Sequence, residues 1–223
     1  MSGPRVAVAV FGKDLRLDLR SRDRLGHMAV FAALIVALLS ITLPSVTPAT
    51  EAWLPALVWI VFLLVSLLGL SRSFQSEVEE GAIALLAQAP CDRGWVFLGK
   101  AGANAAALFG VQLWTALLFE VFLGVEWENA PLRALGIGLL GAGGLSALGT
   151  LLAAMATAAR FREFLLPVLL FPLILPVLVF ASHATAATLA QSEIPTLWWG
   201  ALALYDWIVI VVGYVVFDFV LED

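Results

Sequence analysis

The residues from Gly94 to Ala101, GWVFLGKA, come nearest to a motif for nucleotide chemistry, the phosphate-binding loop G-x-x-x-x-G-K-[ST]. The last position is Ala101, so the hydroxyl group that would hold Mg²⁺ is missing. The interior, Trp95 to Leu98, is bulky where backbone amides must wrap a phosphate, and no strand is expected before it. We therefore expect no nucleotide site here, and if ATP drives this protein, another subunit binds the ATP.

A serine and a histidine suggest a second kind of chemistry, that of an intramembrane serine hydrolase. Ser146 lies in GGLSALG, where the nucleophile pattern G-x-S-x-G requires glycine at the position of Leu148. The two histidines, His27 and His183, belong to no cluster with metal-ligand spacing. A single cysteine, Cys91, excludes an intramolecular disulfide. The sequence therefore predicts no catalytic residue, no metal site and no resident cofactor, and we expect the chain not to be an enzyme.

Four other residues are candidate contacts with a bound cargo: His183, Trp198, Trp199 and Asp206. An exposed histidine beside tryptophans can act as an axial ligand to haem. The alternative is that the tryptophans form an interfacial belt and that His183 is a solvated loop residue. Asp206 is an acid within a hydrophobic segment, where such residues are costly and often functional. A polar path and an interhelical hydrogen bond are both open as its role.

The composition indicates that lipid, and not water, surrounds most of the side chains of this chain. Hydrophobic residues make up 62% of the 223 residues and charged residues only 13%, against about 25% charged residues in soluble domains. The charges gather in short clusters between apolar stretches that are long enough to cross a hydrocarbon core of about 30 Å. In lipid, the backbone N–H and C=O groups of a segment must form their hydrogen bonds with one another, and a helix allows this. The sequence therefore predicts an all-α membrane protein whose partners include the lipid bilayer but no nucleic acid.

Six spans are expected within a single transmembrane domain of residues 1–223, the first of them retained as an anchor. They are placed at about 27–43, 53–70, 101–119, 134–159, 164–181 and 197–217. With the N-terminus in the cytoplasm, every lysine and arginine except Arg133 falls on the cytoplasmic side. This distribution predicts that both termini lie in the cytoplasm.

Three further features of the helices can be predicted. In residues 1–25, Phe11, Leu15 and Leu19 recur at i, i+4 and i+8, which is typical of an amphipathic helix in the membrane interface; a plain charged tail is the alternative. The fourth span has a small residue at every fourth position from 138 to 158, which favours close helix packing. The fifth span has prolines that each remove a backbone donor and favour a kink; they are Pro167, Pro172 and Pro176.

The loop of residues 72–99 joins the second and third spans on the predicted cytoplasmic side. It contains three acidic residues, a glycine, an apolar run and a proline within residues 77–90, followed by a basic and aromatic stretch. A short amphipathic helix here could transmit force from a soluble partner to the membrane helices; a solvated surface loop is the alternative.

This loop resembles the membrane subunits of the ABC-2 exporter class, in which the segment is a coupling helix that docks on an ATPase. More narrowly, the chain resembles the CcmB family, or haem exporter protein B, of cytochrome c maturation. Three segments carry the resemblance, which extends over nearly the full length: FQSEVEEGAIALLAQAP (Phe74–Pro90), GKAGAN (Gly99–Asn104) and FLLPVLLFPLILPVLVFA (Phe164–Ala181).

The resemblance implies a permease subunit of an ABC complex in the bacterial inner membrane that takes part in haem export or delivery for c-type cytochrome biogenesis. It implies three partners: a CcmA-like ATPase subunit that binds ATP, a CcmC-like haem-handling subunit and a small CcmD-like subunit. The residues that it places at the ATPase contact are Phe74, Glu77, Glu79, Glu80, Gly81, Leu85 and Leu86. The tryptophan-rich haem platform of CcmC is not matched, because Trp198 and Trp199 lack the adjoining aspartate. Two alternatives are an ABC-2 exporter of another lipophilic cargo and an assembly scaffold that transports nothing.

Overall fold

The computed structural model describes residues 3–21, 23–43, 52–73, 92–127, 130–158 and 162–220, and within these ranges all regular structure is helical. The helices are α1 (Gly3–Ser21), α2 (Asp23–Thr42), α4 (Leu54–Ser73), α7 (Arg93–Leu123), α8 (Pro131–Ala158), α9 (Arg162–Leu189) and α10 (Thr196–Val220). All of these except α1 are long and apolar enough to cross a membrane. The prediction of an all-α membrane protein with six spans is confirmed.

Helix α7 is the longest of these and has well-defined ends. It begins after Asp92, whose side chain accepts a hydrogen bond from the backbone N–H of Gly94 at 2.9 Å. It ends at Gly124, whose left-handed backbone (φ 68°) suits a residue without a Cβ. Its 31 residues span about 46 Å at 1.5 Å per residue. That length exceeds a hydrocarbon core of about 30 Å, so α7 must project beyond the core.

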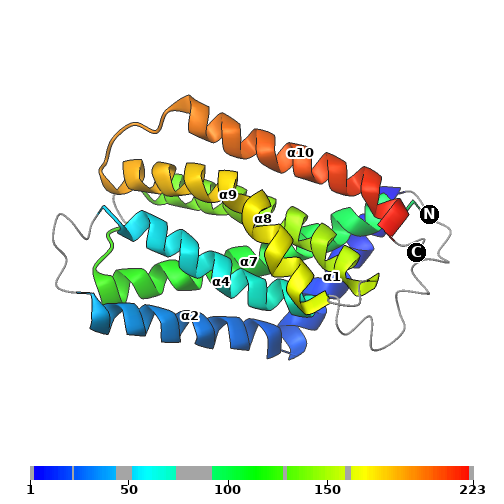
Figure 1. The fold of residues 1–223 in the computed structure, drawn as a ribbon, viewed down its shortest axis with the longest axis horizontal. Coiled ribbons are helices and arrows are strands. Elements are labelled where there is room, and N and C mark those ends of the chain that lie inside the picture. Colours follow the sequence, from blue (N-terminus) through cyan, green and yellow to red (C-terminus); the bar gives the residue numbers. More distant parts are fainter. Residues whose placement is uncertain are drawn as a thin grey trace.

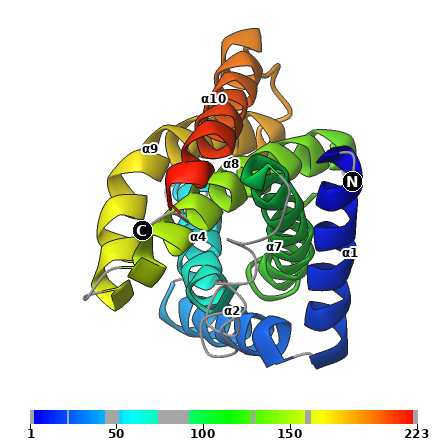
Figure 2. The same ribbon diagram turned by 90° about the vertical axis from the view of Figure 1, so that its right-hand side faces the viewer.

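Helix α8 is the centre of the bundle. It packs against α7, α9 and α10, and 83% of its most apolar stretch is buried, against 17% for α2 and 22% for α10. The small residues at four-residue spacing are buried from Gly138 to Ala154, which lets neighbouring backbones approach closely. Helices α2 and α10 lie on opposite sides of the bundle (Figure 2).

Helix α1 has a different direction from the other helices. It lies across the bundle, at the end where both termini are found (Figures 1 and 2). This direction is the one that a helix in the plane of the membrane interface would have.

Helix α9 continues through all three prolines and bends along its length (Figure 1). Pro176 cannot donate to the carbonyl of residue 172, and the hydroxyl group of Tyr205 on α10 donates to the neighbouring carbonyl of Leu173 at 2.7 Å. The helix ends at Leu189, eight residues beyond the expected end at 181. The apolar run stops at 181, but the alanines and threonines that follow are compatible with a helix, and Thr188 donates to the carbonyl of Ala184 at 2.8 Å. His183 therefore lies in a helix and not in a loop.

The contact between α4 and α8 gives a test of this packing. A Cβ at Gly141 would lie 2.1 Å from the ring of Trp59, and the indole N–H of Trp59 is held by Thr185 at 3.0 Å. We expect Gly141→Ala to destabilise the protein by about 1–3 kcal/mol through overpacking, seen as a lower denaturation midpoint in detergent. Gly110→Ala on α7 is the matched control, because a Cβ there meets no atom within 4 Å. Equal midpoints for the two variants would contradict the close approach of α4 and α8.

Candidate functional site

A series of charged and polar side chains connects four helices near the end of the bundle where the termini lie. Arg24 on α2 donates to Asp18 on α1 at 2.6 Å and to the side-chain oxygen of Asn104 on α7 at 2.8 Å. Asn104 in turn donates to the hydroxyl group of Thr150 on α8 at 2.8 Å. One turn before Asn104 on α7, the ammonium group of Lys100 lies 3.2 Å from Asp14 on α1. We call these six residues the polar network.

Close contact between α1 and α7 makes this arrangement possible. A Cβ at Gly99 would lie 2.6 Å from the carbonyl oxygen of Ala7 and 2.8 Å from Cβ of Val10. The absence of a side chain at Gly99 therefore lets the backbone of α1 touch α7. Phe11 covers Gly102, the next glycine on the same helix.

The face of α1 that meets the bundle contains Phe11 of the predicted apolar stripe, together with two acids. Leu19 is 59% exposed, whereas the carboxylates of Asp14 and Asp18 are only 19% and 15% exposed. Apolar residues at i, i+4 and i+8 predict an amphipathic helix, but they do not reveal acids that have cationic partners far along the chain.

The polar network is largely removed from solvent. Lys100 is 2% exposed, and the side chain of Arg24 is 12% exposed. Burial raises the pKa of Asp18, an effect that the nearby Arg24 cation opposes. Each buried charge here depends on a partner of opposite sign, since removing one partner leaves an uncompensated charge. The network therefore links α1 and α2 to α7 and α8.

The predicted ATPase contacts, Phe74, Glu77, Glu79, Glu80, Gly81, Leu85 and Leu86, lie outside the described residues. Their flanks are described: α4 ends at Ser73 and α7 begins at Arg93, both at the end of the bundle where the termini lie (Figure 1). The polar network is at this same end. Lys100 and Asn104 on α7 lie about 10 and 16 Å beyond Arg93, at 1.5 Å per residue.

The candidate cargo contacts do not form one site. His183 on α9 is exposed and stacks on Trp198 on α10, with ring centroids 5.4 Å apart. Trp199 instead lies over α8, 3.0 Å from where a Cβ at Gly136 would be. Asp206 lies eight residues beyond Trp198 on α10, about 12 Å along the helix.

Asp206 is 8% exposed and packs against Gly144 of α8, where a Cβ would lie 2.4 Å from its Oδ1 atom. Among the described residues this oxygen has no hydrogen-bond partner. The geometry therefore shows no interhelical hydrogen bond to Oδ1 of Asp206.

Two motifs considered for chemistry have structural roles. The segment Gly94–Ala101 is helical, so its amides cannot wrap a phosphate as a loop would. Ser146 is fully buried and donates to the backbone carbonyl of Ala101 at 2.5 Å, between α8 and α7. In the part of the chain that the structure describes, no three His, Cys, Asp or Glu side chains gather as a metal site would need.

Sequence reasoning missed the polar network, because Lys100 and Arg24 were treated only as cations that mark the cytoplasmic side. A signal was present: Asp14 and Asp18 are four residues apart, as are Lys100 and Asn104, so each pair lies on one helix face.

Comparison with known proteins gives the family. The family model described as CcmB protein matches residues 5–219. A protein of Pseudomonas aeruginosa named heme exporter protein B is 30% identical over 180 residues, which cover 81% of this chain and 80% of the relative. Proteins of the same name from Rhodobacter capsulatus and Paracoccus denitrificans are 31% and 30% identical and cover 78% and 83% of this chain. The matched range includes every described helix from α2 to α9 and most of α1 and α10, and the chain belongs to the CcmB family.

Proposed function

We propose that this chain is the membrane subunit of an ABC-type complex for haem export or delivery in c-type cytochrome biogenesis. Membership of the CcmB family carries the proposal, together with relatives that are named heme exporter protein B. In this proposal haem is cargo and not a resident cofactor of the chain. ATP is bound and hydrolysed by a separate, CcmA-like subunit, and CcmC-like and CcmD-like subunits complete the complex.

The proposed orientation places both termini in the cytoplasm of a bacterium and the helices in its inner membrane. The distribution of lysine and arginine supports this orientation. Residues 74–90 then face the ATPase subunit, and the segments after α2, α7 and α9 face the periplasm. His183, Trp198 and Trp199 would lie toward the periplasmic side, where they are proposed cargo contacts together with Asp206.

The proposed mechanism follows the connections of α7. Movement of the ATPase would displace residues 74–90, which are joined to α7 through Asp92. The polar network ties α7 to α1 and α2 on one side and to α8 on the other. Because α8 is the centre of the bundle and packs against α9 and α10, a displacement of α7 would be passed on to the helices that carry the proposed cargo contacts.

Charge reversal in the loop tests the ATPase contact. Reversing two charges with Glu79→Lys and Glu80→Lys should weaken association with the ATPase subunit about tenfold or more, because like charges placed opposite each other cost several kcal/mol. The measurement is the amount of ATPase subunit that co-purifies with this chain, together with ATP hydrolysis by the complex. Glu193→Lys, an exposed acid at the opposite end of the bundle, is the matched control. Normal association and hydrolysis in the double variant would contradict the proposed contact.

Removal of one cation tests the polar network. Arg24→Met removes the cation that pairs with the Asp18 carboxylate and the hydrogen bond that Arg24 donates to Asn104. We expect a loss of stability of about 3 kcal/mol, measured as a lower denaturation midpoint in detergent. The double variant Arg24→Met, Asp18→Asn should recover much of this loss, because no uncompensated charge then remains.

The recovered double variant separates folding from transmission of force. We expect it to bind the ATPase subunit and hydrolyse ATP but to deliver less haem for each ATP hydrolysed, because Arg24 no longer ties α2 to α1 and α7. Arg16→Gln, which removes an exposed cation from α1, should change neither quantity. Full haem delivery by the double variant would show that the network is structural only.

A further inference from the structure

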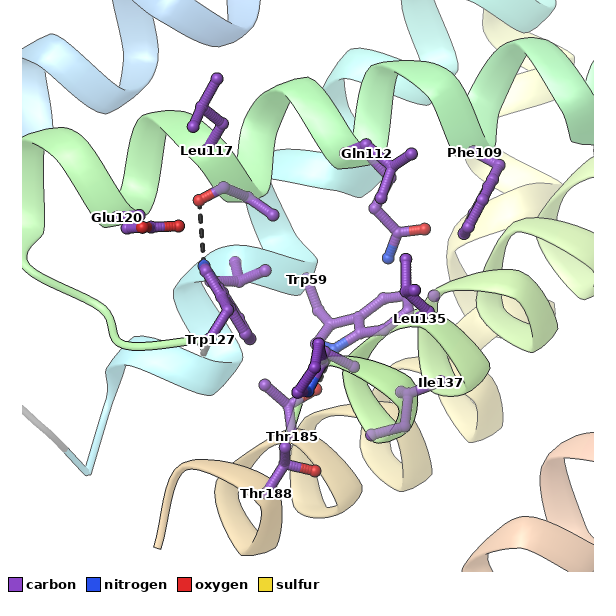
Figure 3. A pocket seen from close by; sticks show the side chains of 16 residues that line it. Trp59, Phe109, Gln112, Leu117, Glu120, Trp127, Leu135, Ile137, Thr185 and Thr188 are labelled. Atoms are coloured by element: carbon purple, nitrogen blue, oxygen red, sulfur yellow. Dashed lines mark hydrogen bonds between the residues drawn. The ribbon is translucent and has the colours of Figure 1, made fainter. Parts of the chain in front are cut away.

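A cavity of about 310 Å³ lies between α4, α7, α8 and α9, apart from all the residues discussed as cargo contacts. Figure 3 shows Gln112 of α7 pointing into it opposite Trp59 of α4. On α7 the lining residues run from Phe109 to Glu120, a distance of about 16 Å at 1.5 Å per residue. The volume falls within the range of small-molecule sites, roughly 300–1,000 Å³.

The cavity opens sideways, between α7 and α8. Three of its lining residues, Leu113 and Leu117 on α7 and Leu135 on α8, are 44%, 48% and 41% exposed. These leucines belong to helices that cross the membrane, so their exposed surface faces lipid. An occupant would therefore enter from the lipid phase.

One polar atom inside the cavity lacks a partner. Gln112 is 8% exposed, and its Oε1 atom is buried without a hydrogen bond from any described residue. Two other polar groups of the wall are engaged: the indole N–H groups of Trp59 and Trp127 donate to Thr185 and to the carbonyl of Ala116 at 3.0 Å each. Glu120 is a further polar residue of the wall, at the last lining position on α7. A buried acceptor without a donor costs about 1–3 kcal/mol, which an occupant with a donor would recover.

The chemistry of the wall narrows the choice of occupant. A bound water needs two to four polar partners, and among the described lining residues Oε1 of Gln112 is the single buried polar side-chain atom that has no hydrogen bond. Haem iron is held by His, Cys, Met or Tyr, and the described residues that line the cavity include none of these types. The wall suits an apolar body with a single hydrogen-bond donor.

We propose that this cavity binds, from the lipid phase, an elongated apolar molecule that carries one hydroxyl group, and that this hydroxyl group donates to Oε1 of Gln112. The site is separate from the proposed haem function and does not depend on it. A membrane-resident alcohol and a lipophilic alcohol from elsewhere share this chemistry.

The test uses two photoreactive probes of the same length, hexadecanol with a mid-chain diazirine and the same molecule with fluorine in place of the hydroxyl group. The protein is reconstituted in phosphatidylcholine nanodiscs, and cross-linked peptides are identified by mass spectrometry. We expect about fivefold more cross-linking by the alcohol in residues 109–120 and 131–138. Equal cross-linking by both probes would overturn the proposal, and so would cross-links confined to other residues.

Three variants make the test specific. Gln112→Met keeps the length of the side chain but removes the acceptor, so the preference for the alcohol should disappear. Leu135→Trp narrows the opening and should lower cross-linking by both probes, even if Gln112→Met fails to fold. Leu139→Met, at an exposed position of α8 outside the cavity, should leave cross-linking unchanged. A preference that persists in folded Gln112→Met, or undiminished cross-linking in Leu135→Trp, would contradict binding at this site.

A competition experiment distinguishes the two sources of the alcohol. Unlabelled phosphatidylglycerol or a free long-chain alcohol is added, and only a molecule whose aliphatic hydroxyl group can enter the cavity should compete with the probe.

Discussion

Burial of apolar side chains between helices contributes little free energy to their association in a membrane, because the lipid tails are as apolar as those side chains. Association instead needs close van der Waals contact, which small residues permit, and polar groups that pair across helices. Helix α8 meets this requirement along most of its length. Its glycines receive the ring of Trp59 at Gly141, the carboxyl group of Asp206 at Gly144 and the side chain of Leu70 at Gly149. Because two helices, α4 and α10, rest on these glycines, the positions of these two spans depend on how closely they can approach α8.

The polar network connects the helices at the end of the bundle where the termini lie. Helix α1 has too few apolar residues to be stabilised by lipid in the way that a membrane span is. Helix α7 projects beyond the hydrocarbon core. Gly99 brings the two backbones together, and the pairs Lys100–Asp14 and Arg24–Asp18 then hold α1 by charges that have little access to water. Buried pairs are weak evidence for stability, because desolvation offsets much of the attraction. Their stronger effect is on specificity: Asp14 and Asp18 are about one turn apart, so a shift of α1 by one helical turn would place only one of the two carboxylates opposite the two cations.

The spans and the all-α fold could be predicted because the requirement of lipid is local: a stretch of about 20 apolar residues is visible without knowing its neighbours. The near match to a phosphate loop and the buried serine could also be set aside from local spacing alone. The polar network could not be predicted, since Asp14 and Lys100 are 86 positions apart in the chain and only the packing of Gly99 brings them together. The end of α9 was misplaced for a related reason. Beyond 181 the helix is stabilised by contacts such as Thr185 with Trp59, which no window of hydropathy contains.

Helix α7 joins the two features that the sequence did not reveal. Asn104, in the polar network, and Gln112, in the cavity, are eight residues apart on this helix, about 12 Å at 1.5 Å per residue. No proline interrupts α7 between them, so the helix between the two residues is expected to move as a rigid unit. A displacement applied at Arg24 or Lys100 must then change either the packing of α7 against α8 at Gly138, where Gln112 lies, or the tilt of the whole helix. In both cases the walls of the cavity move relative to one another, because α4 and α9, which complete it, have no side chain in the polar network. The energetics of the cavity and of the network are therefore linked through one helix, whatever molecule the bundle handles.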